Sequence, residues 1–249
     1  MKDNGVLSKK DIEDKKYTDF ISTVSHELRT PLTSIMGFAD TLLTSGEMLS
    51  EEQKRKFLLI IKEQSKRLIN MVENLLVVSK IQNSNEKLVY KSVDANELIT
   101  KILQLIKIQF SDRNFIVDLK NDLPLILVDT DKFQQIFINL VENALKYSSE
   151  EVVVKTDYDS ENVYISVIDK GVGILDDDKS KIFEKFSRLD TPLTRKTQGS
   201  GLGLYIVKKT VEKMEGKISV IDNIPKGSCF KVSFKQAQYQ SQTEKKLRG

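Results

Sequence analysis

The sequence predicts a multi-domain protein of class α and α+β, in which a long helical hairpin is followed by an α/β two-layer sandwich. In residues 11–82, apolar side chains recur at steps of three and four, the period of amphipathic helices. In residues 94–235, helical periods alternate with short strand patterns, which indicates a sheet with helices on one face. Residues 83–93, which begin with a polar run, separate the two regions and are predicted to be a linker.

The composition narrows the class of function. Hydrophobic residues make up 39% of the 249 residues and charged residues 30%, enough for real cores beneath a charged surface. The net charge of +3 does not favour a nucleic-acid partner. A single cysteine, Cys229, excludes an internal disulfide and fits a reducing compartment, so a cytoplasmic location is expected. No apolar run reaches the roughly 20 residues of a membrane span, so any membrane attachment is expected to belong to a sensor portion absent from this chain.

The first predicted helix spans residues 11–44. Residues 1–14 are interpreted as the end of an input linker helix. The polar break TSGEMLSEEQ follows, in which Ser50 before Glu51 and Glu52 predicts a helix N-cap. The apolar positions that recur along the helix are Tyr17, Phe20, Ile21, Val24, Leu28, Leu32, Ile35, Ala39, Leu42 and Leu43.

The second predicted helix spans residues 51–82, with apolar residues close to heptad spacing. Two long helices with a short connection predict an antiparallel hairpin. Its apolar stripe is too wide for one hairpin to cover, so a dimeric four-helix bundle is favoured. A monomeric hairpin packed on the downstream domain is the alternative.

His26, the only histidine, lies in SHELRTPL on the first helix. With Val24 at the centre of the buried face, His26 lies about 200° around the helix and is predicted to face solvent. A solvent-facing imidazole is available as a nucleophile. Because Pro31 lacks an N–H, the carbonyl of Glu27 loses its helical partner, and the helix is expected to bend there. The hypothesis is that this bend lets the N-terminal part of the helix move relative to the bundle.

The second region is predicted to alternate helices and strands, and its end, residues 236–249, is predicted to be disordered. The predicted helices are 94–112, 131–147, 178–186 and 202–215, and the predicted strands are 114–119, 125–128, 151–158, 162–169, 217–222 and 228–235.

Two glycine-containing segments of this region suggest a ligand site. In DKGVGI, Asp169 ends a predicted strand, and the glycines after it let backbone approach a flat ligand while the carboxylate accepts a hydrogen bond. Ordinary turn chemistry is the alternative. In QGSGLGLYIVKK, glycines precede an amphipathic helix whose free N–H groups could bind an anion, although a glycine-rich loop without a ligand explains the pattern too.

The predicted helix 131–147 carries an unusual polar face. Asn139, Asn143, Lys146 and Tyr147 share one side of it, opposite the apolar face. Amide oxygens suit Mg²⁺, a lysine suits phosphate, and a tyrosine ring can cover a base or sugar. A merely solvated face would more often carry Glu and Lys, so a binding role is favoured.

These segments resemble the motifs of the sensor histidine kinases of bacterial two-component systems. SHELRTPL resembles their H box, NLVENALKYS their N box, DKGVGI their G1 box, IFEKFSR their F box, GSGLGL their G2 box and PKGSCFKV their last glycine box. The six motifs stand in family order and span nearly the whole chain. The resemblance implies a dimerisation and histidine phosphotransfer domain in residues 15–82, and a catalytic ATP-binding domain of the Bergerat type in residues 94–235.

The resemblance also implies a role for individual residues toward ATP and Mg²⁺. Asn143 would coordinate the metal ion, and Asp169 would accept a hydrogen bond from the adenine amino group. Arg188 would be available to the γ-phosphate. The other nucleotide-binding residues that it implies are Asn139, Lys146, Tyr147, Gly171, Gly173, Phe183, Phe186, Gly199, Gly201, Gly203 and Ser228.

The implied function is autophosphorylation of His26 from Mg-ATP, with Glu27 taking the imidazole proton. The phosphoryl group would then pass to an aspartate on the receiver domain of a response regulator, and Thr30 would position the water that dephosphorylates this regulator. The implied assembly is a homodimer through residues 15–82.

The resemblance leaves alternatives to a kinase. In the ATPase branches of the superfamily, a glutamate that activates water stands four residues before the metal-binding asparagine. This chain has Asn139 there, so hydrolysis is not the implied outcome. Two alternatives stay open: a nucleotide-binding signalling scaffold that acts mainly as a regulator phosphatase, and a conformational ATPase of the GHKL type.

Overall fold

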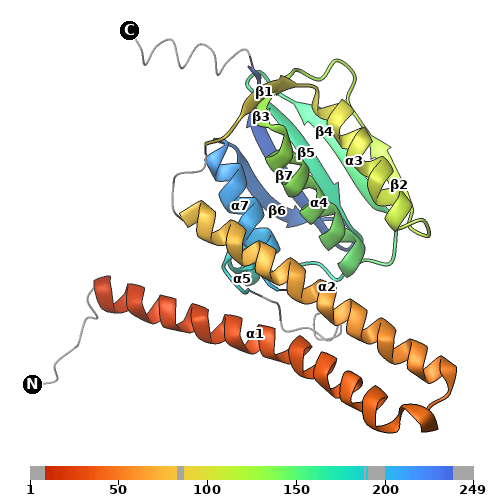
Figure 1. The fold of residues 1–249 in the computed structure, drawn as a ribbon. Helices are drawn as coiled ribbons and strands as arrows, with labels where there is room; N and C mark the ends of the chain where they lie inside the picture. The colour runs from red at the N-terminus through yellow and green to blue at the C-terminus, as the bar shows by residue number, and fades with distance from the viewer. Residues whose placement is uncertain (1–8, 83–86, 188, 190–199, 238–249) are drawn as a thin grey trace, which may run out of the picture. The chain divides into compact units, whose positions relative to one another are not determined.

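The structure of the protein is a computed structural model that describes residues 9–82, 87–187, 189 and 200–237. The chain divides into two compact units, Met1–Val78 and Ser79–Gly249. The first unit is helical and the second combines helices with a sheet (Figure 1). This confirms the predicted fold class.

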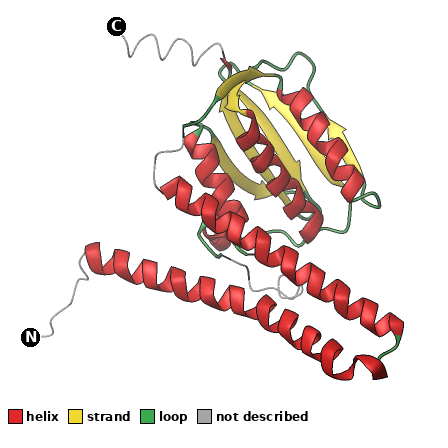
Figure 2. Ribbon diagram, in the orientation of Figure 1, coloured by secondary structure: helices red, strands yellow, loops and turns green. Residues whose placement is uncertain are grey.

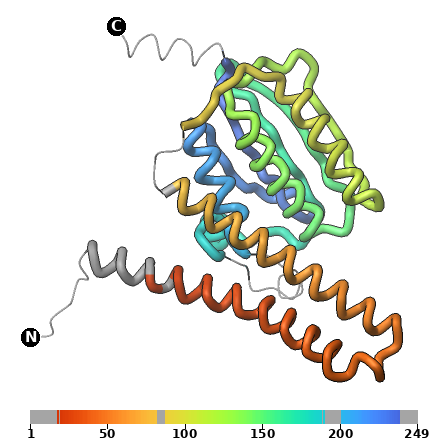
Figure 3. Tube along the Cα trace, viewed as in Figure 1, coloured from red at the N-terminus to blue at the C-terminus, as the bar shows by residue number. Residues whose placement is uncertain are grey.

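The first unit is an α-helical hairpin. Helix α1 spans Lys9–Ser45, a short 3-10 helix η1 spans Gly46–Met48, and helix α2 begins at Glu51 and continues to Gln82 (Figure 3). Both predicted helices are therefore confirmed to within two residues. Helix α1 passes through Pro31 without interruption. The bend at this proline stays a prediction.

The predicted N-cap at Ser50 is confirmed. The Ser50 Oγ accepts a hydrogen bond from the Gln53 backbone N–H at 3.2 Å, and the Gln53 Oε1 accepts one from the Ser50 N–H at 2.9 Å. This reciprocal pair is a capping box, which satisfies N–H groups that the first turn of a helix leaves without partners. It determines where α2 begins.

The second unit is a two-layer sandwich. Figure 2 shows its helices on one face of the sheet. Within the described residues, five strands form the main sheet in the order β2-β4-β5-β7-β6, and β1 pairs with β3 separately. The elements are β1 (Tyr90–Val93), α3 (Ala95–Gln109), β2 (Phe115–Asp118), β3 (Ile126–Asp129), α4 (Thr130–Tyr147), β4 (Val152–Tyr158), β5 (Asn162–Ile168), α5 (Asp176–Lys179), η2 (Lys181–Phe183), α7 (Gly203–Lys213), β6 (Lys217–Asp222) and β7 (Ser228–Lys235).

The core of this unit lies between the helical layer and the sheet. Phe133, Ile136, Phe137, Leu140 and Ala144, the predicted apolar face of α4, are all at most 2% exposed. Strand β5 alternates buried and half-buried residues along its length, as expected of a strand with one face on the core.

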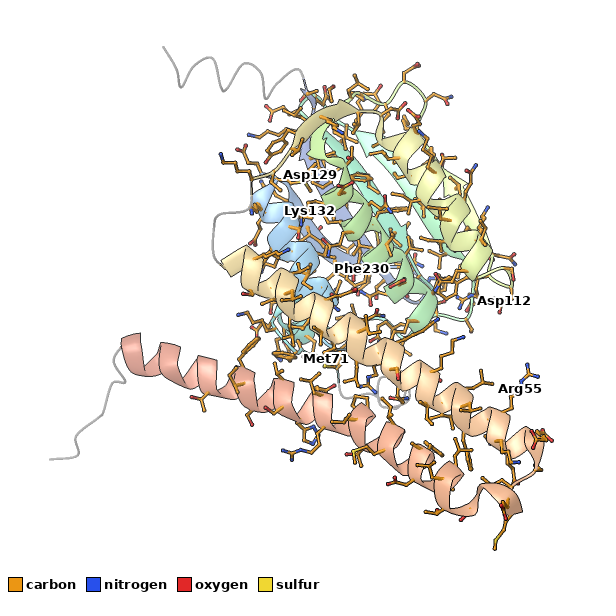
Figure 4. The ribbon with its side chains drawn as sticks, viewed as in Figure 1. Arg55, Met71, Asp112, Asp129, Lys132 and Phe230 are labelled. Atoms are coloured by element: carbon orange, nitrogen blue, oxygen red, sulfur yellow. The ribbon has the colours of Figure 1, made fainter. Side chains whose placement is uncertain are left out.

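Helix α4 begins directly after β3 because Asp129 caps it. The Asp129 Oδ1 accepts hydrogen bonds from the backbone N–H groups of Asp131 and Lys132, both at 3.1 Å. Its other carboxylate oxygen accepts one from the Val89 N–H at 2.9 Å, which ties the segment before β1 to the same point. Asp129 and Lys132 are labelled in Figure 4. The cap sets the phase at which α4 presents its polar face.

Two elements differ from the sequence prediction. Strand β1 lies inside the segment predicted to be a linker. The sequence does not indicate this strand, because none of its residues is buried and its exposure does not alternate. The predicted helix 178–186 is wrong as one element: α5 ends at Lys179 and the 3-10 turn η2 follows. Phe186 has a left-handed backbone with φ of 59°, which a helix cannot continue through.

The prediction that the disordered tail begins at residue 236 is wrong at Gln236, which is only 3% exposed and whose side chain donates a hydrogen bond to the Asp159 carbonyl oxygen at 2.7 Å. Residues 238–249 of that tail lie outside the described residues. In the part of the chain that the structure describes, no helix is long and apolar enough to cross a membrane.

The turn between β4 and β5 is built on the Asp159 carboxylate. It accepts hydrogen bonds from the Tyr164 hydroxyl at 2.5 Å, from the Glu161 N–H at 2.9 Å and from the Asn162 N–H at 2.8 Å. These hydrogen bonds lower the pKa of Asp159 from 3.8 to about 2. The bond from Tyr164 has the largest effect, and those from the two backbone N–H groups come next. The ionised carboxylate therefore stabilises this hairpin.

We expect Asp159→Asn to weaken the acid dependence of stability. Because the native pKa lies below the unfolded one, the contribution of Asp159 is full above pH 4 and is lost as the pH falls toward about 2. The urea midpoint of the wild type should therefore fall more steeply between pH 5 and pH 2 than that of the variant. Asp157→Asn on the same hairpin is the control. Parallel curves for wild type and Asp159→Asn would contradict the prediction.

Candidate functional site

His26 is exposed on α1, as its helical phase predicts, whereas Val24 and Leu28 on the opposite face are half-buried. Thr30 lies one turn further on and is exposed too. Its hydroxyl donates a hydrogen bond to the His26 carbonyl oxygen at 3.3 Å. The imidazole is thus presented to solvent with a hydroxyl on the same helical face.

Glu27, next to His26, forms an ion pair across the hairpin. Arg67 Nη2 on α2 donates to Glu27 Oε2 at 3.4 Å, and the side chains are 19% and 22% exposed respectively. The pair fixes the direction of the Glu27 carboxylate beside the histidine. Nothing in the sequence alone indicates Arg67, because the register between the two helices is set only in three dimensions.

A cavity of the α/β unit contains five of the predicted nucleotide-binding residues: Asn143, Tyr147, Asp169, Gly173 and Ser228. They come from α4, from the end of β5 and the segment after it, and from β7. The cavity has apolar walls that the sequence analysis did not identify, formed by Val172, Ile174, Ile182, Leu189, Leu204 and Phe230. In sequence, such residues cannot be told from ordinary core residues. Phe230 is labelled in Figure 4.

Asp169 is the buried acid of this cavity, with 4% of its surface exposed. Its Oδ1 accepts a hydrogen bond from the Gly171 N–H at 2.7 Å, and its own N–H donates to the Ser228 carbonyl oxygen at 2.9 Å. Burial raises the pKa of the Asp169 carboxyl, and the backbone N–H groups of Gly171 and Ser228, which stabilise the ionised carboxylate, oppose this rise. Each carboxylate oxygen can accept more than one hydrogen bond, so the acid keeps acceptor capacity for a ligand N–H.

The polar residues of α4 divide between the cavity and its surroundings. Asn143 is half-buried in the cavity, and within the described chain its amide has no hydrogen-bond partner. Lys146 lines a neighbouring hollow together with Gly171, and its Nζ lies 4.8 Å from the centroid of the Tyr147 ring. The amide of Asn143 thus lies in the same cavity as Asp169 and Tyr147, and the Lys146 ammonium lies beside the Tyr147 ring.

Asn139 lies outside this cavity. Its Nδ2 donates a hydrogen bond to the Gln135 carbonyl oxygen at 2.9 Å, one turn back along α4. Its Oδ1 faces Gly203 at the start of α7, where an added Cβ would lie 3.0 Å away. The residue therefore stands where α4 and α7 meet.

Glycines permit the close backbone contacts of the site. An added Cβ at Gly171 would lie 2.4 Å from the Tyr147 carbonyl oxygen. Gly201, with φ of 66°, packs on the backbone of Phe186, where an added Cβ would lie 2.7 Å from Cα. These two contacts join the segment after β5 to α4, and the segment before α7 to the end of the η2 region.

The remaining predicted residues lie in the core or outside the described residues. Phe183 is 8% exposed and belongs to the hydrophobic core, whereas its neighbour Ile182 reaches the cavity. Arg188 and Gly199 lie outside the described residues.

Two family models match the chain along its length. Residues 16–84 match the His Kinase A (phospho-acceptor) domain. Residues 128–238 match the histidine kinase-, DNA gyrase B-, and HSP90-like ATPase. The exposed histidine lies in the first match and the cavity in the second. The chain belongs to the sensor histidine kinases of two-component systems.

Curated and solved histidine kinases resemble this chain in sequence and fold. "Sensor protein kinase WalK" of Staphylococcus saprophyticus is 36% identical over 209 residues, which are 82% of this chain and 34% of that protein. A structure of full-length ShkA in complex with AMPPNP matches 88% of this chain and 46% of that one, with a TM-score of 0.64 and 27% identity. The histidine kinase ThkA, solved in complex with the response regulator protein TrrA, matches 92% of this chain over 64% of its own, with a TM-score of 0.71 and 25% identity. The chain thus spans about a third of the length of the curated relative.

We expect Gly171→Ala to destabilise the α/β unit. The new methyl group would overlap the Tyr147 carbonyl oxygen at 2.4 Å and the Asp169 Oδ1 at 2.7 Å, and such overpacking costs about 1–3 kcal/mol. The urea midpoint of the intact chain measures the loss. Gly37→Ala in α1, where a Cβ would meet nothing within 4 Å, is the control and should be neutral or stabilising. Equal midpoints for Gly171→Ala and the wild type would contradict the crowding.

Proposed function

We propose that this chain is the catalytic portion of a sensor kinase that transfers the γ-phosphoryl group of ATP to His26. It then passes the group to an aspartate of a response regulator. The observation that supports this most strongly is the only histidine of the chain, exposed in the segment that matches the phospho-acceptor domain, beside an oriented carboxylate.

The cavity of the α/β unit is the proposed ATP site. A flat base would lie between the apolar walls, with its amino group donating to Oδ2 of Asp169. The phosphates would extend toward Lys146 and the start of α7. The ShkA complex with AMPPNP supports a nucleotide of this kind.

Mg²⁺ fits the residues present. Within the described residues no cluster of three or more His, Cys, Asp or Glu could hold a metal ion by itself. The unpartnered amide of Asn143 supplies one oxygen, so the nucleotide phosphates and water would complete the shell. When bound, the ion would neutralise charge on the transferring phosphoryl group.

The proposed chemistry uses an imidazole nitrogen of His26 as nucleophile. Its lone pair forms the N–P bond, the bond from the γ-phosphorus to the bridging oxygen breaks, and ADP leaves. The Glu27 carboxylate takes the imidazole proton, and Arg67 holds that carboxylate in place. Thr30 is proposed to position water during dephosphorylation of the regulator. The ThkA structure with TrrA supports a response regulator as the partner.

The hairpin is proposed to be the homodimer interface in a cytoplasmic protein. It carries two exposed apolar stripes at helical spacing: Ile69, Val72 and Leu76 on α2, and Leu32, Met36 and Leu43 on α1, each between 47% and 84% exposed. Contiguous apolar surface of this kind is typical of a protein interface. A four-helix bundle of two hairpins would cover it.

We expect the wild-type chain, incubated with γ-labelled ATP and Mg²⁺, to acquire protein label that is acid-labile and base-stable. His26→Gln removes the acceptor and should abolish the label, as should Asn143→Ala, which removes the amide ligand. Glu27→Gln should slow labelling by about 10²-fold or more, because general-base catalysis contributes that much. Glu52→Gln, an exposed glutamate of α2, is the matched control and should label normally.

Three outcomes would contradict the kinase assignment. Label that survives His26→Gln would overturn the acceptor. Steady release of phosphate without protein label would favour the conformational ATPase. Nucleotide binding with regulator dephosphorylation but no label would favour the scaffold.

We expect the chain to sediment as a dimer in analytical ultracentrifugation. The double variant Ile69→Asp with Leu76→Asp places charge on the apolar stripe and should raise the dimer dissociation constant at least about tenfold, since each buried side chain contributes about 1.5–3 kcal/mol. Asn70→Asp, exposed beside the stripe, is the control. A monomeric wild type, or a double variant that dimerises normally, would contradict this interface.

A further inference from the structure

Asn223 connects the turn between β6 and β7 to the acid of the proposed ATP site. Its side-chain Nδ2 donates to the Asp169 carbonyl oxygen at 3.0 Å and to the Lys226 carbonyl oxygen at 3.2 Å. Its backbone N–H donates to the Gly227 carbonyl oxygen at 3.0 Å. The asparagine therefore closes its own turn and bonds a peptide 54 residues earlier in the chain.

The turn lies directly on the peptide that follows Asp169. An added Cβ at Gly227 would lie 2.0 Å from the Asp169 carbonyl oxygen and 2.7 Å from the Lys170 Cα. Gly227 has φ of 110°, a conformation that favours glycine. No side chain fits between the turn and the peptide, so a shift of the turn would displace Asp169.

The start of the turn is anchored separately. Lys179 Nζ pairs with the Asp222 carboxylate at 2.8 Å and with the Asp176 carboxylate at 2.6 Å, which ties the end of β6 to α5. The turn is thus held at Asp222 and presents the Asn223 amide to Asp169 from a supported position.

Three contacts determine where the Asp169 carboxylate points. Its N–H is bonded to Ser228, its carbonyl oxygen to Asn223, and its Oδ1 to the Gly171 N–H. With both backbone groups and one carboxylate oxygen held, the direction of Oδ2 is fixed. Of these three contacts, only the one from Asn223 has a side chain other than that of Asp169 as a partner. Substitution of Asn223 therefore removes this contact and leaves the Asp169 carboxylate itself unchanged.

We propose that Asn223 is a positioning residue that aims Asp169 Oδ2 at the amino group of a 6-aminopurine nucleotide, and so contributes to the selection of adenine. This rests on the proposed ATP site. Asparagine suits the role because its NH₂ carries two donors for two carbonyl acceptors. Aspartate, of the same shape, would place oxygen against both carbonyls and repel them.

The test compares two nucleotides on the full-length chain by calorimetric titration: ATP, and purine riboside triphosphate, which lacks the exocyclic amino group. Asn223→Asp should weaken ATP binding about three- to tenfold, the value of one lost hydrogen bond, and should change binding of the second nucleotide less than about twofold. Asn121→Asp, which adds the same charge in an exposed turn, should change neither. Asn223→Ala provides a second variant if the charged one does not fold.

Each other result has a definite meaning. Equal weakening for both nucleotides would show that Asn223 supports the whole cavity, and would overturn the proposal while leaving the ATP site intact. Unchanged binding of both would overturn it as well. A wild type that binds the two nucleotides equally, or binds neither, would contradict the proposed contact of Asp169 itself, before any variant is considered.

Discussion

The α/β unit depends on one buried carboxylate. Removing Asp169 from water is costly unless hydrogen bonds replace hydration, and the chain supplies them from its own backbone after β5. The Gly171 N–H reaches the carboxylate because no side chain intervenes there, and Gly227 lets the β6–β7 turn pack directly on the Asp169 peptide. The need to hold this acid brings the end of β5, the β6–β7 turn and the end of α4 together, and the cavity is the space they leave.

In the hairpin, by contrast, the candidate functional side chain is exposed rather than buried. This side chain is His26, the proposed phosphoryl acceptor, and the partly buried Glu27–Arg67 ion pair joins the two helices beside it. A partly buried ion pair contributes little net stability, because desolvation offsets the attraction, but its geometry is specific. The proposed dimer would cover the exposed apolar stripes, and the exposed imidazole of His26 is accessible to a substrate.

Sequence periodicity predicted most elements, because burial on one face of a helix or strand leaves a period of 3.6 or 2. It failed where this signal is absent: β1 has no buried residue, and the region around Phe186 is determined by a left-handed backbone. For the site, motifs predicted Asp169 and Asn143 because their chemistry is local. Asn223 and Arg67 act through partners 54 and 40 residues away, and such register is visible only in the fold.

Helix α4 carries an amide, Asn139, at the position where a general base would activate water for hydrolysis. Hydrolysis needs a base that activates water near the γ-phosphate. At the position where the ATPase branches place glutamate, Asn139 bonds its own helix and faces Gly203, and an amide cannot accept a proton there. Of the described residues, Asp169 is the only carboxylate lining the cavity, and it is committed to Gly171 on one oxygen. Without such a base to activate water, the exposed nitrogen of His26, which is a better nucleophile than neutral water, is the acceptor that we propose.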